Sequence, residues 1–142
     1  MTVKRVLVGW DGSPDAREAF RMGCSLADGL GAEVVVLEVV HQPFSPELFD
    51  EGRRQLARHA TELAEEVGEH GPGLGSRVTL HHVVIAADDT AKALRDYAAE
   101  HGFDLLVIGR HGVDAALHPR VGRVTERQVR ESTCPVLIVA AR

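Results

Sequence analysis

The chain has 142 residues, 44% of them apolar and 26% charged, which is typical of a globular domain with a sizeable core. Its net charge is -5, and the basic residues lie among acidic ones, which disfavours nucleic-acid binding. The apolar stretches are far shorter than the roughly 18 residues of a membrane span, and two cysteines without a CxxC pair form no disulfide framework. We therefore expect a cytoplasmic protein that contacts neither nucleic acid nor membrane.

The first half of the chain predicts two strands, each followed by a helix. An apolar run at residues 3–9 ends at a glycine and predicts a buried strand. Ser13 and Pro14 then mark a helix start, because serine caps the first turn and proline suits the first helical position. Residues 33–40 are rich in valine, which is typical of a parallel strand covered on both faces. A loop and a long helix, about residues 46–70, follow.

The second half continues the alternation after a glycine- and proline-rich segment at residues 71–75. Neither side of this segment is long enough to bury a core alone, so we interpret it as a loop inside one domain. Residues 77–85 predict a third strand, and Asp88 or Asp89 is expected to cap a helix that runs to about His101. The remaining elements are a strand, a helix and a strand at residues 103–108, 122–132 and 135–140.

Strands and helices thus alternate along the whole chain. This pattern predicts an α/β fold over residues 1–142, a single domain with a doubly wound, five-stranded parallel sheet in a Rossmann-like three-layer sandwich. Ligands of such sheets bind beyond the carboxyl ends of the strands, where the strand order reverses. The loops expected at those ends are residues 10–13, 40–46, 86–90 and 109–121.

The most informative of these segments, residues 109–122, follows the fourth predicted strand, and we call it the glycine loop. Gly109 and Gly112 are separated by two residues, and nine residues then precede Gly122 at the mouth of a predicted helix. Glycine lets a backbone approach a phosphate closely, and a helix N-terminus offers unpaired N–H groups and a positive dipole end. If the chain binds a small molecule, we expect the site here.

The loop after the first strand contributes an acid, Asp11. Neither a G-x-G-x-x-G fingerprint nor a P-loop is present in the chain. A carboxylate at this point can bind a ribose hydroxyl or Mg²⁺, and the alternative is that Asp11 only caps the turn into the first helix. A receiver-type phosphoacceptor domain is disfavoured, because it needs a second acid after the third strand and a lysine after the fifth.

The histidines and cysteines indicate no metal centre and no catalytic group. His81 and His82 are adjacent on a predicted strand, so they point to opposite faces. His111 and His118 lie in the glycine loop without a second ligand at metal-binding spacing. Cys134 has no adjacent base, and no Ser-His-Asp set or carboxylate pair can be defended. Enzymatic activity is therefore not expected, although the sequence does not exclude it.

Four segments match a known family in order and spacing. They are residues 6–13 (Val-Leu-Val-Gly-Trp-Asp-Gly-Ser), 37–40, 104–112 and 134–139. On these segments the chain resembles a single-domain universal stress protein along its whole length. The resemblance implies five parallel strands in the order 3-2-1-4-5, which agrees with the fold expected from the alternation of elements.

One branch of that family binds ATP through glycine, two residues, glycine, nine residues, glycine and then serine or threonine. The glycine loop fits both spacings. The resemblance implies that Asp11 lies near the ribose and phosphates, where it can hold Mg²⁺ through the nucleotide, and that Val39 lines the adenine pocket. The implied nucleotide-binding residues are Trp10, Asp11, Val39, Gly109, Arg110, Gly112, Gly122, Arg123, Val124 and Thr125.

Two positions depart from the pattern of that branch. Arg123 replaces the serine or threonine, and Asp88 replaces a glycine common after the third strand, where an acid facing the site would repel phosphate. The missing hydroxyl removes one hydrogen bond, worth about 0.5–1.5 kcal/mol, while the backbone N–H remains. Arg123 can bind phosphate through its planar fork, fill the triphosphate position, or point outward to Glu126 or Asp114.

Three functions stay open at this point. The first is a stress-response regulatory module that binds ATP and alters a partner interaction, and the second is a nucleotide-free dimeric protein that lost ATP binding through Arg123. A slow ATP hydrolase ranks last, because no general base is found. The resemblance also implies a homodimer through residues 135–140, an apolar edge strand that needs cover or a partner.

Overall fold

The computed structural model describes residues 2–41, 49–71, 77–112 and 121–141, and the structural statements below refer to these residues. Strands and helices alternate as predicted, so the α/β class is confirmed. The elements are β1 (Arg5–Trp10), α1 (Pro14–Leu30), β2 (Glu33–His41), α2 (Phe49–His70), β3 (Leu80–Ala87), α3 (Thr90–Glu100), β4 (Leu105–Gly109), α4 (Arg123–Glu131) and β5 (Val136–Val139).

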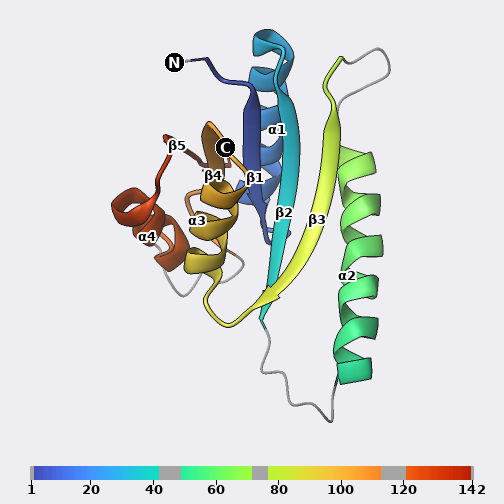
Figure 1. Ribbon diagram of the computed structural model, residues 1–142. Coiled ribbons are helices and arrows are strands. Elements are labelled where there is room, and N and C mark those ends of the chain that lie inside the picture. The colour runs from blue at the N-terminus through green and yellow to red at the C-terminus, as the bar shows by residue number, and fades with distance from the viewer. Residues whose placement is uncertain (1, 42–48, 72–76, 113–120, 142) are drawn as a thin grey trace.

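All five strands form one parallel sheet in the order β3-β2-β1-β4-β5 (Figure 1). The order implied by the family resemblance is therefore confirmed. Consecutive strands β1, β2 and β3 progress toward one edge, whereas β4 and β5 lie on the other side of β1. The strand order thus reverses between β1 and β4, and the carboxyl ends of these two strands mark the expected ligand position.

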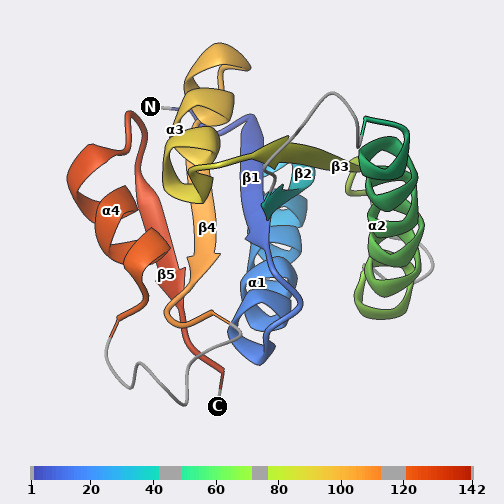
Figure 2. The same cartoon turned by 90° about the horizontal axis from the view of Figure 1, so that it is seen from below.

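Helices cover both faces of the sheet, with α1 and α2 on one face and α3 and α4 on the other (Figure 2). The central strand β1 is fully buried at Val6, Leu7 and Val8, as the continuous apolar run predicted. Helix α1 approaches β1 closely at Gly23, where an added Cβ would lie 2.7 Å from Val8 Cγ2. A small residue is therefore required where this helix crosses the sheet.

The helix ends follow the predicted capping chemistry. The Ser13 hydroxyl accepts the N–H of Ala16 at 3.2 Å, and α1 ends at Gly31 with a left-handed φ of 67°. Of the two acids proposed to cap α3, Asp89 is the one that does so, accepting the N–H of Lys92 at 3.1 Å. No helix in the described ranges is long and apolar enough to cross a membrane.

Strand β3 was predicted at residues 77–85 but spans Leu80–Ala87. Its ladder with β2 runs from the pair Val34–Leu80 to the pair His41–Ala87. The pairing with β2 therefore determines where β3 begins and ends. Local sequence gives little information about this register, because it is decided by pairing between segments far apart in the chain. The expected helix start at residue 46 lies outside the described residues, which resume at Phe49 within α2.

Candidate ligand site

A cavity of about 460 Å³ opens beside the carboxyl ends of β1, β2 and β4, where the strand order reverses. This volume lies within the range of roughly 300–1,000 Å³ that is usual for small-molecule sites. The cavity brings together nine of the ten residues singled out from the sequence. They are Trp10, Asp11, Val39, Gly109, Gly112, Gly122, Arg123, Val124 and Thr125.

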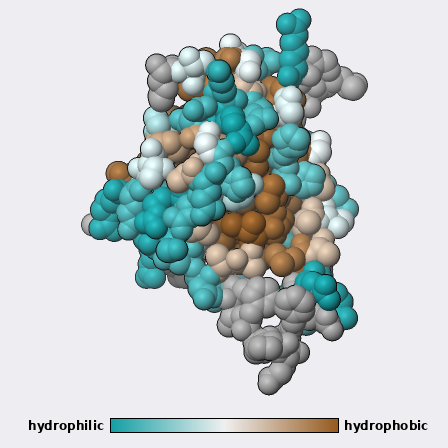
Figure 3. Space-filling view, viewed as in Figure 1, coloured by the Kyte–Doolittle hydropathy of each residue, from teal (hydrophilic) through white to brown (hydrophobic). Residues whose placement is uncertain are grey.

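One side of the cavity is an apolar slot. Leu37 and Val39 come from β2, Leu94 from α3 and Ile108 from β4. Leu37, Leu94 and Ile108 are at least 96% buried, so their positions are fixed by the core. Figure 3 shows apolar surface gathered over β2 and β3 beside α3, where the sheet face continues from this slot. Such a slot suits a flat, largely apolar ring.

The other side is polar and is built on the start of α4. Gly122 is its N-cap residue and provides no side-chain cap, so the first N–H groups of the helix have no partner within it. Gly122 donates its own N–H to the Arg110 carbonyl at 2.9 Å, and Thr125 Oγ1 donates to the Gly109 carbonyl at 2.7 Å. These two bonds hold the uncapped helix start against the end of β4.

Glycine is needed at position 109 for a steric reason. A Cβ there would lie 2.8 Å from Asp15 Cβ and 3.1 Å from the backbone nitrogen of Ala16. The end of β4 thus rests directly on the first turn of α1. At Gly122 the nearest atom to an added Cβ is 3.5 Å away, an ordinary contact. The steric requirement for glycine therefore applies to position 109 and not to position 122.

Asp15 is the residue that sequence reasoning missed. Its side chain is buried, and its Oδ2 accepts the backbone N–H of His111 at 2.9 Å while Oδ1 accepts that of Ala141 at 2.8 Å. Burial raises the pKa of this carboxyl, but the bonds from Ala141 and His111 and the charges of His111 and Arg110 together bring it below its ordinary value. Asp15 is therefore an ionised anchor for the glycine loop.

Asp11 makes the turn contact that the sequence offered as one alternative, and it is placed at the cavity. Its exposed carboxylate accepts the N–H of Ser13 at 2.9 Å, so it does stabilise the turn into α1, and it also lines the cavity.

Trp10 packs edge-on against Phe20 with ring centroids 6.1 Å apart, so its ring belongs to the core on the α1 face. Arg110 does not line the cavity, and its backbone N–H bonds the Val139 carbonyl instead.

Arg123 lies at the polar end of the cavity with an exposed side chain. Its expected partner Glu126 is paired with Arg130 instead, at 3.8 Å along the same helix. The other expected partner, Asp114, lies outside the described residues. Asp88 is exposed and is not among the described residues that line the cavity. Asp88, which the sequence suggested as a source of repulsion toward phosphate, is thus not part of the described cavity wall.

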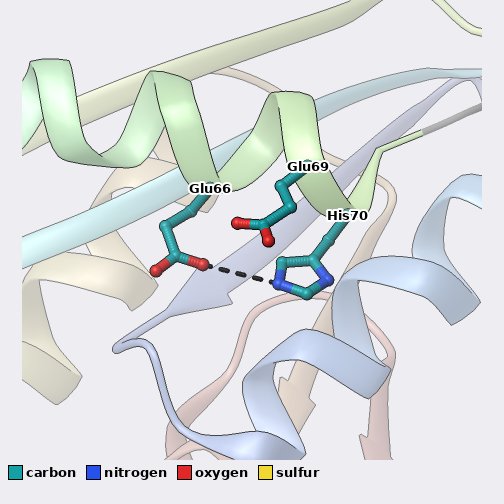
Figure 4. Close-up of side chains that lie close together, drawn as sticks. All are labelled: Glu66, Glu69 and His70. Carbon is teal, nitrogen blue, oxygen red and sulfur yellow. Dashed lines mark ion pairs between the residues drawn. The ribbon is translucent and has the colours of Figure 1, made fainter.

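A second polar cluster lies on the last turns of α2, where donor atoms of Glu66, Glu69 and His70 come within 4.8 Å of one another (Figure 4). The guanidinium of Arg21 donates to His70 Nδ1 at 3.1 Å, and His70 Nε2 lies 3.5 Å from Glu66 Oε2. Arg17 adds a further cation 3.7 Å from Glu66. Both imidazole nitrogens are engaged, so this cluster joins α1 to α2.

The chain is a doubly wound α/β protein with a cavity at the carboxyl edge of its sheet. The family model described as "Universal stress protein family" matches residues 2–140, and the chain belongs to that family. Universal stress protein YxiE of Bacillus subtilis is 27% identical over 147 residues, covering 95% of this chain and 97% of YxiE. The ethanolamine ammonia-lyase small subunit of Pseudomonas fluorescens is 31% identical, but the chain spans 51% of its length.

Solved structures give the same fold. Universal stress protein UspA from Lactobacillus plantarum superposes with a TM-score of 0.77 at 23% identity, covering 98% of this chain and 99% of that one. A universal stress protein in complex with cAMP gives a TM-score of 0.70 at 22% identity over the full length of both chains. A family member from Arabidopsis thaliana with AMP bound gives 0.63 at 17%, covering 98% and 92%. Some similar structures therefore contain adenine nucleotides.

Proposed function

We propose that this cavity binds an adenine nucleotide, specifically ATP with Mg²⁺, and that the bound state alters an interaction with a partner protein. One observation carries the proposal: an apolar slot and an uncapped helix N-terminus face the same cavity at the strand-order reversal. An aromatic base needs the first and a phosphate needs the second. The similar structures that contain AMP and cAMP support the choice of an adenine nucleotide.

Each part of the cavity then has a task. The base lies in the slot formed by Leu37, Val39 and Leu94, while the N–H groups at the start of α4 receive the phosphates. Arg123 contributes a guanidinium, whose charge-assisted hydrogen bonds to phosphate replace those of the missing hydroxyl. Asp11 binds the ribose or holds Mg²⁺ through the nucleotide, since its second carboxylate oxygen is not used in the turn.

Isothermal titration with ATP and Mg²⁺ tests the proposal, together with thermal unfolding in the same buffers. We expect binding heat and a melting temperature that rises with ATP concentration. In Arg123→Ser the affinity falls about tenfold, because a hydrogen bond to a charged group contributes about 1.5–3 kcal/mol and the restored hydroxyl returns about 0.5–1.5 kcal/mol of this. The matched control is Arg130→Ser on the same helix, where the arginine pairs with Glu126 and does not line the cavity.

The absence of both heat and a thermal shift would contradict nucleotide binding. Tighter binding by Arg123→Ser would show that the arginine occupies the phosphate position, and equal binding would show that it contacts no phosphate.

A slow ATP hydrolase remains the weakest alternative, and a hydrolysis assay with Asp11→Ala as control tests it. Cytoplasmic location also stays a prediction from the sequence.

The second candidate is a dimeric interaction protein without nucleotide. Strand β5 ends the sheet order, and Ile138 on it is 38% exposed while Val129 on α4 is 62% exposed. An apolar edge of this kind needs cover, so we propose a homodimer through β5 in either case. A monomer in light scattering at micromolar concentration would contradict the dimer. Mass spectrometry of the protein as purified separates the two functions, because only the first predicts co-purified nucleotide.

A further inference from the structure

His111 has a second, chemically distinct contact with Asp15. Its ring Nδ1 lies 3.2 Å from Asp15 Oδ2, the same oxygen that accepts its backbone N–H at 2.9 Å. The two side chains are only 15% and 12% exposed. His111 also lines the cavity, on the loop that faces the start of α4. His111 therefore contacts a buried carboxylate and also borders the cavity that contains the proposed phosphate position.

We infer that His111 is a proton-linked recognition residue for the phosphate, and that its ring takes up a proton when the nucleotide binds. The inference rests on the proposed nucleotide site and adds a form of regulation to it. Histidine is the side chain whose ordinary titration falls in the physiological pH range, so such a link operates there. Binding then becomes stronger as the pH falls, because protonation and phosphate binding favour each other by the same factor.

The surroundings of the ring set the electrostatic conditions in which this link operates. Backbone bonds and neighbouring positive charges outweigh burial and keep the pKa of Asp15 low, so its carboxylate stays charged at neutral pH. A negative charge 3.2 Å away favours an imidazolium. A bound phosphate adds a second anion at the cavity. The proton thus enters between two negative groups, one permanent and one supplied by the ligand.

The other charged groups near the ring act in both directions. Asp11, from the turn before α1, lines the same cavity and favours protonation of His111. Arg123 from α4 lines it as well, and Arg110 precedes His111 in the chain; both oppose protonation of the free site. Among the described residues, Asp11, His111 and Arg123 are the titratable groups of the cavity wall. A bound phosphate would add a further negative charge to this set.

Two hydrogen bonds hold the backbone of His111 in place without the ligand. Its backbone N–H is fixed by Asp15, and its carbonyl accepts a bond from the Ser13 hydroxyl at 3.5 Å. These contacts fix the backbone of His111 beside the cavity. A purely structural histidine would have the same contacts, so the test must measure the proton and not only stability or affinity.

The first experiment follows the imidazole signals of the wild-type protein by NMR over about pH 5.5–8.5, with and without saturating ATP and Mg²⁺. We expect ATP to raise the protonation midpoint of His111 by about one pH unit, which corresponds to a tenfold coupling. The signal is assigned by its loss in His111→Gln. His81, exposed on β3 away from the cavity, is the internal control and should keep its midpoint.

The second experiment measures ATP affinity at pH 6 and pH 8 for the wild type, His111→Gln and the control His81→Gln. Phosphate itself titrates near pH 6, but this contribution is the same in all three proteins and cancels in the comparison. We expect the wild type and His81→Gln to lose about tenfold more affinity than His111→Gln between the two values. Asp15→Asn should reduce this difference even where His111 is present.

The outcomes separate the two proposals. ATP binding with equal pH profiles in wild type and His111→Gln, or an unmoved His111 midpoint, would overturn the inference and leave the nucleotide site standing. An absence of ATP binding at every pH would overturn the nucleotide site and the inference with it. If His111→Gln fails to fold, the NMR midpoint of the wild type alone decides, with His111 assigned through backbone connectivity.

Discussion

Gly109→Ala tests the contact on which the geometry of the site depends. The added methyl group would lie 2.8 Å from Asp15 Cβ, 3.0 Å from the Asp15 carbonyl carbon and 3.1 Å from the Ala16 nitrogen. Comfortable carbon contacts are about 3.5–4.0 Å, so the end of β4 and the first turn of α1 must separate by several tenths of an ångström. Two of the three atoms belong to the backbone, which cannot move aside as a side chain can.

The magnitude follows from this overlap. Overpacking of a well-packed site costs about 1–3 kcal/mol, while alanine restricts the unfolded chain and returns about 0.4–1 kcal/mol. The φ of Gly109 is not left-handed, so no backbone strain is added. We expect a net loss of about 1–2 kcal/mol in the free energy of unfolding. For a chain of this size the melting temperature falls by about 2–8 °C.

Urea unfolding followed by circular dichroism measures the change, with two glycine controls. Gly122→Ala meets nothing closer than 3.5 Å and should cost less than about 1 kcal/mol. Gly29→Ala, inside α1 with open space around it, should stabilise the protein by about 0.5–1 kcal/mol. If Gly109→Ala unfolds within about 0.5 kcal/mol of the wild type, the close contact between β4 and α1 is wrong.

Two further predictions concern buried groups. Because the folded pKa of Asp15 lies below its ordinary value of 3.8, its ionised form stabilises the protein above that value, and this contribution is lost as the pH falls through the folded pKa. Asp15→Asn should therefore lower the free energy of unfolding at pH 7, and the difference from wild type should shrink below about pH 4 in acid-dependent urea unfolding; a constant difference would contradict the low pKa. Burial raises the pKa of Cys24 to about 11, so iodoacetamide at pH 8 should modify the half-buried Cys134 in the native protein while Cys24 reacts only after denaturation. Peptide mass mapping checks this, and equal native rates would refute it.

The fold could be predicted from the sequence because local signals agreed with one another. Ser13, Pro14 and Gly31 mark both ends of α1 through capping chemistry, and the valine-rich run of β2 indicates a strand buried on both faces. The limits of β3 could not be predicted, because the ladder with β2 sets them and not the residues of β3 alone. The register of a strand depends on the two segments that pair, so it cannot be deduced from either segment alone.

The site was predicted in part for the same reason. The glycine spacing located the loop and the helix start, and nine implied residues do line one cavity. Asp15 was missed because an acid in the first turn of a helix is commonplace, and its partners are 96 and 126 residues away in sequence. For His111 a metal-ligand role was considered and disfavoured, and no specific partner was proposed. Nothing in the sequence places its ring beside a carboxylate.

The two bonds of Asp15 also have a consequence for the order of assembly. One carboxylate joins the start of α1, the glycine loop and Ala141, segments that span almost the whole chain. Contacts of such sequence separation form late, because the loop between them must be closed first. The Asp15 anchor of the glycine loop is therefore complete only when the residues after β5 have docked. A ligand of this cavity would recognise the fully folded chain in preference to any partly folded form, and it would act as a check on the completion of folding.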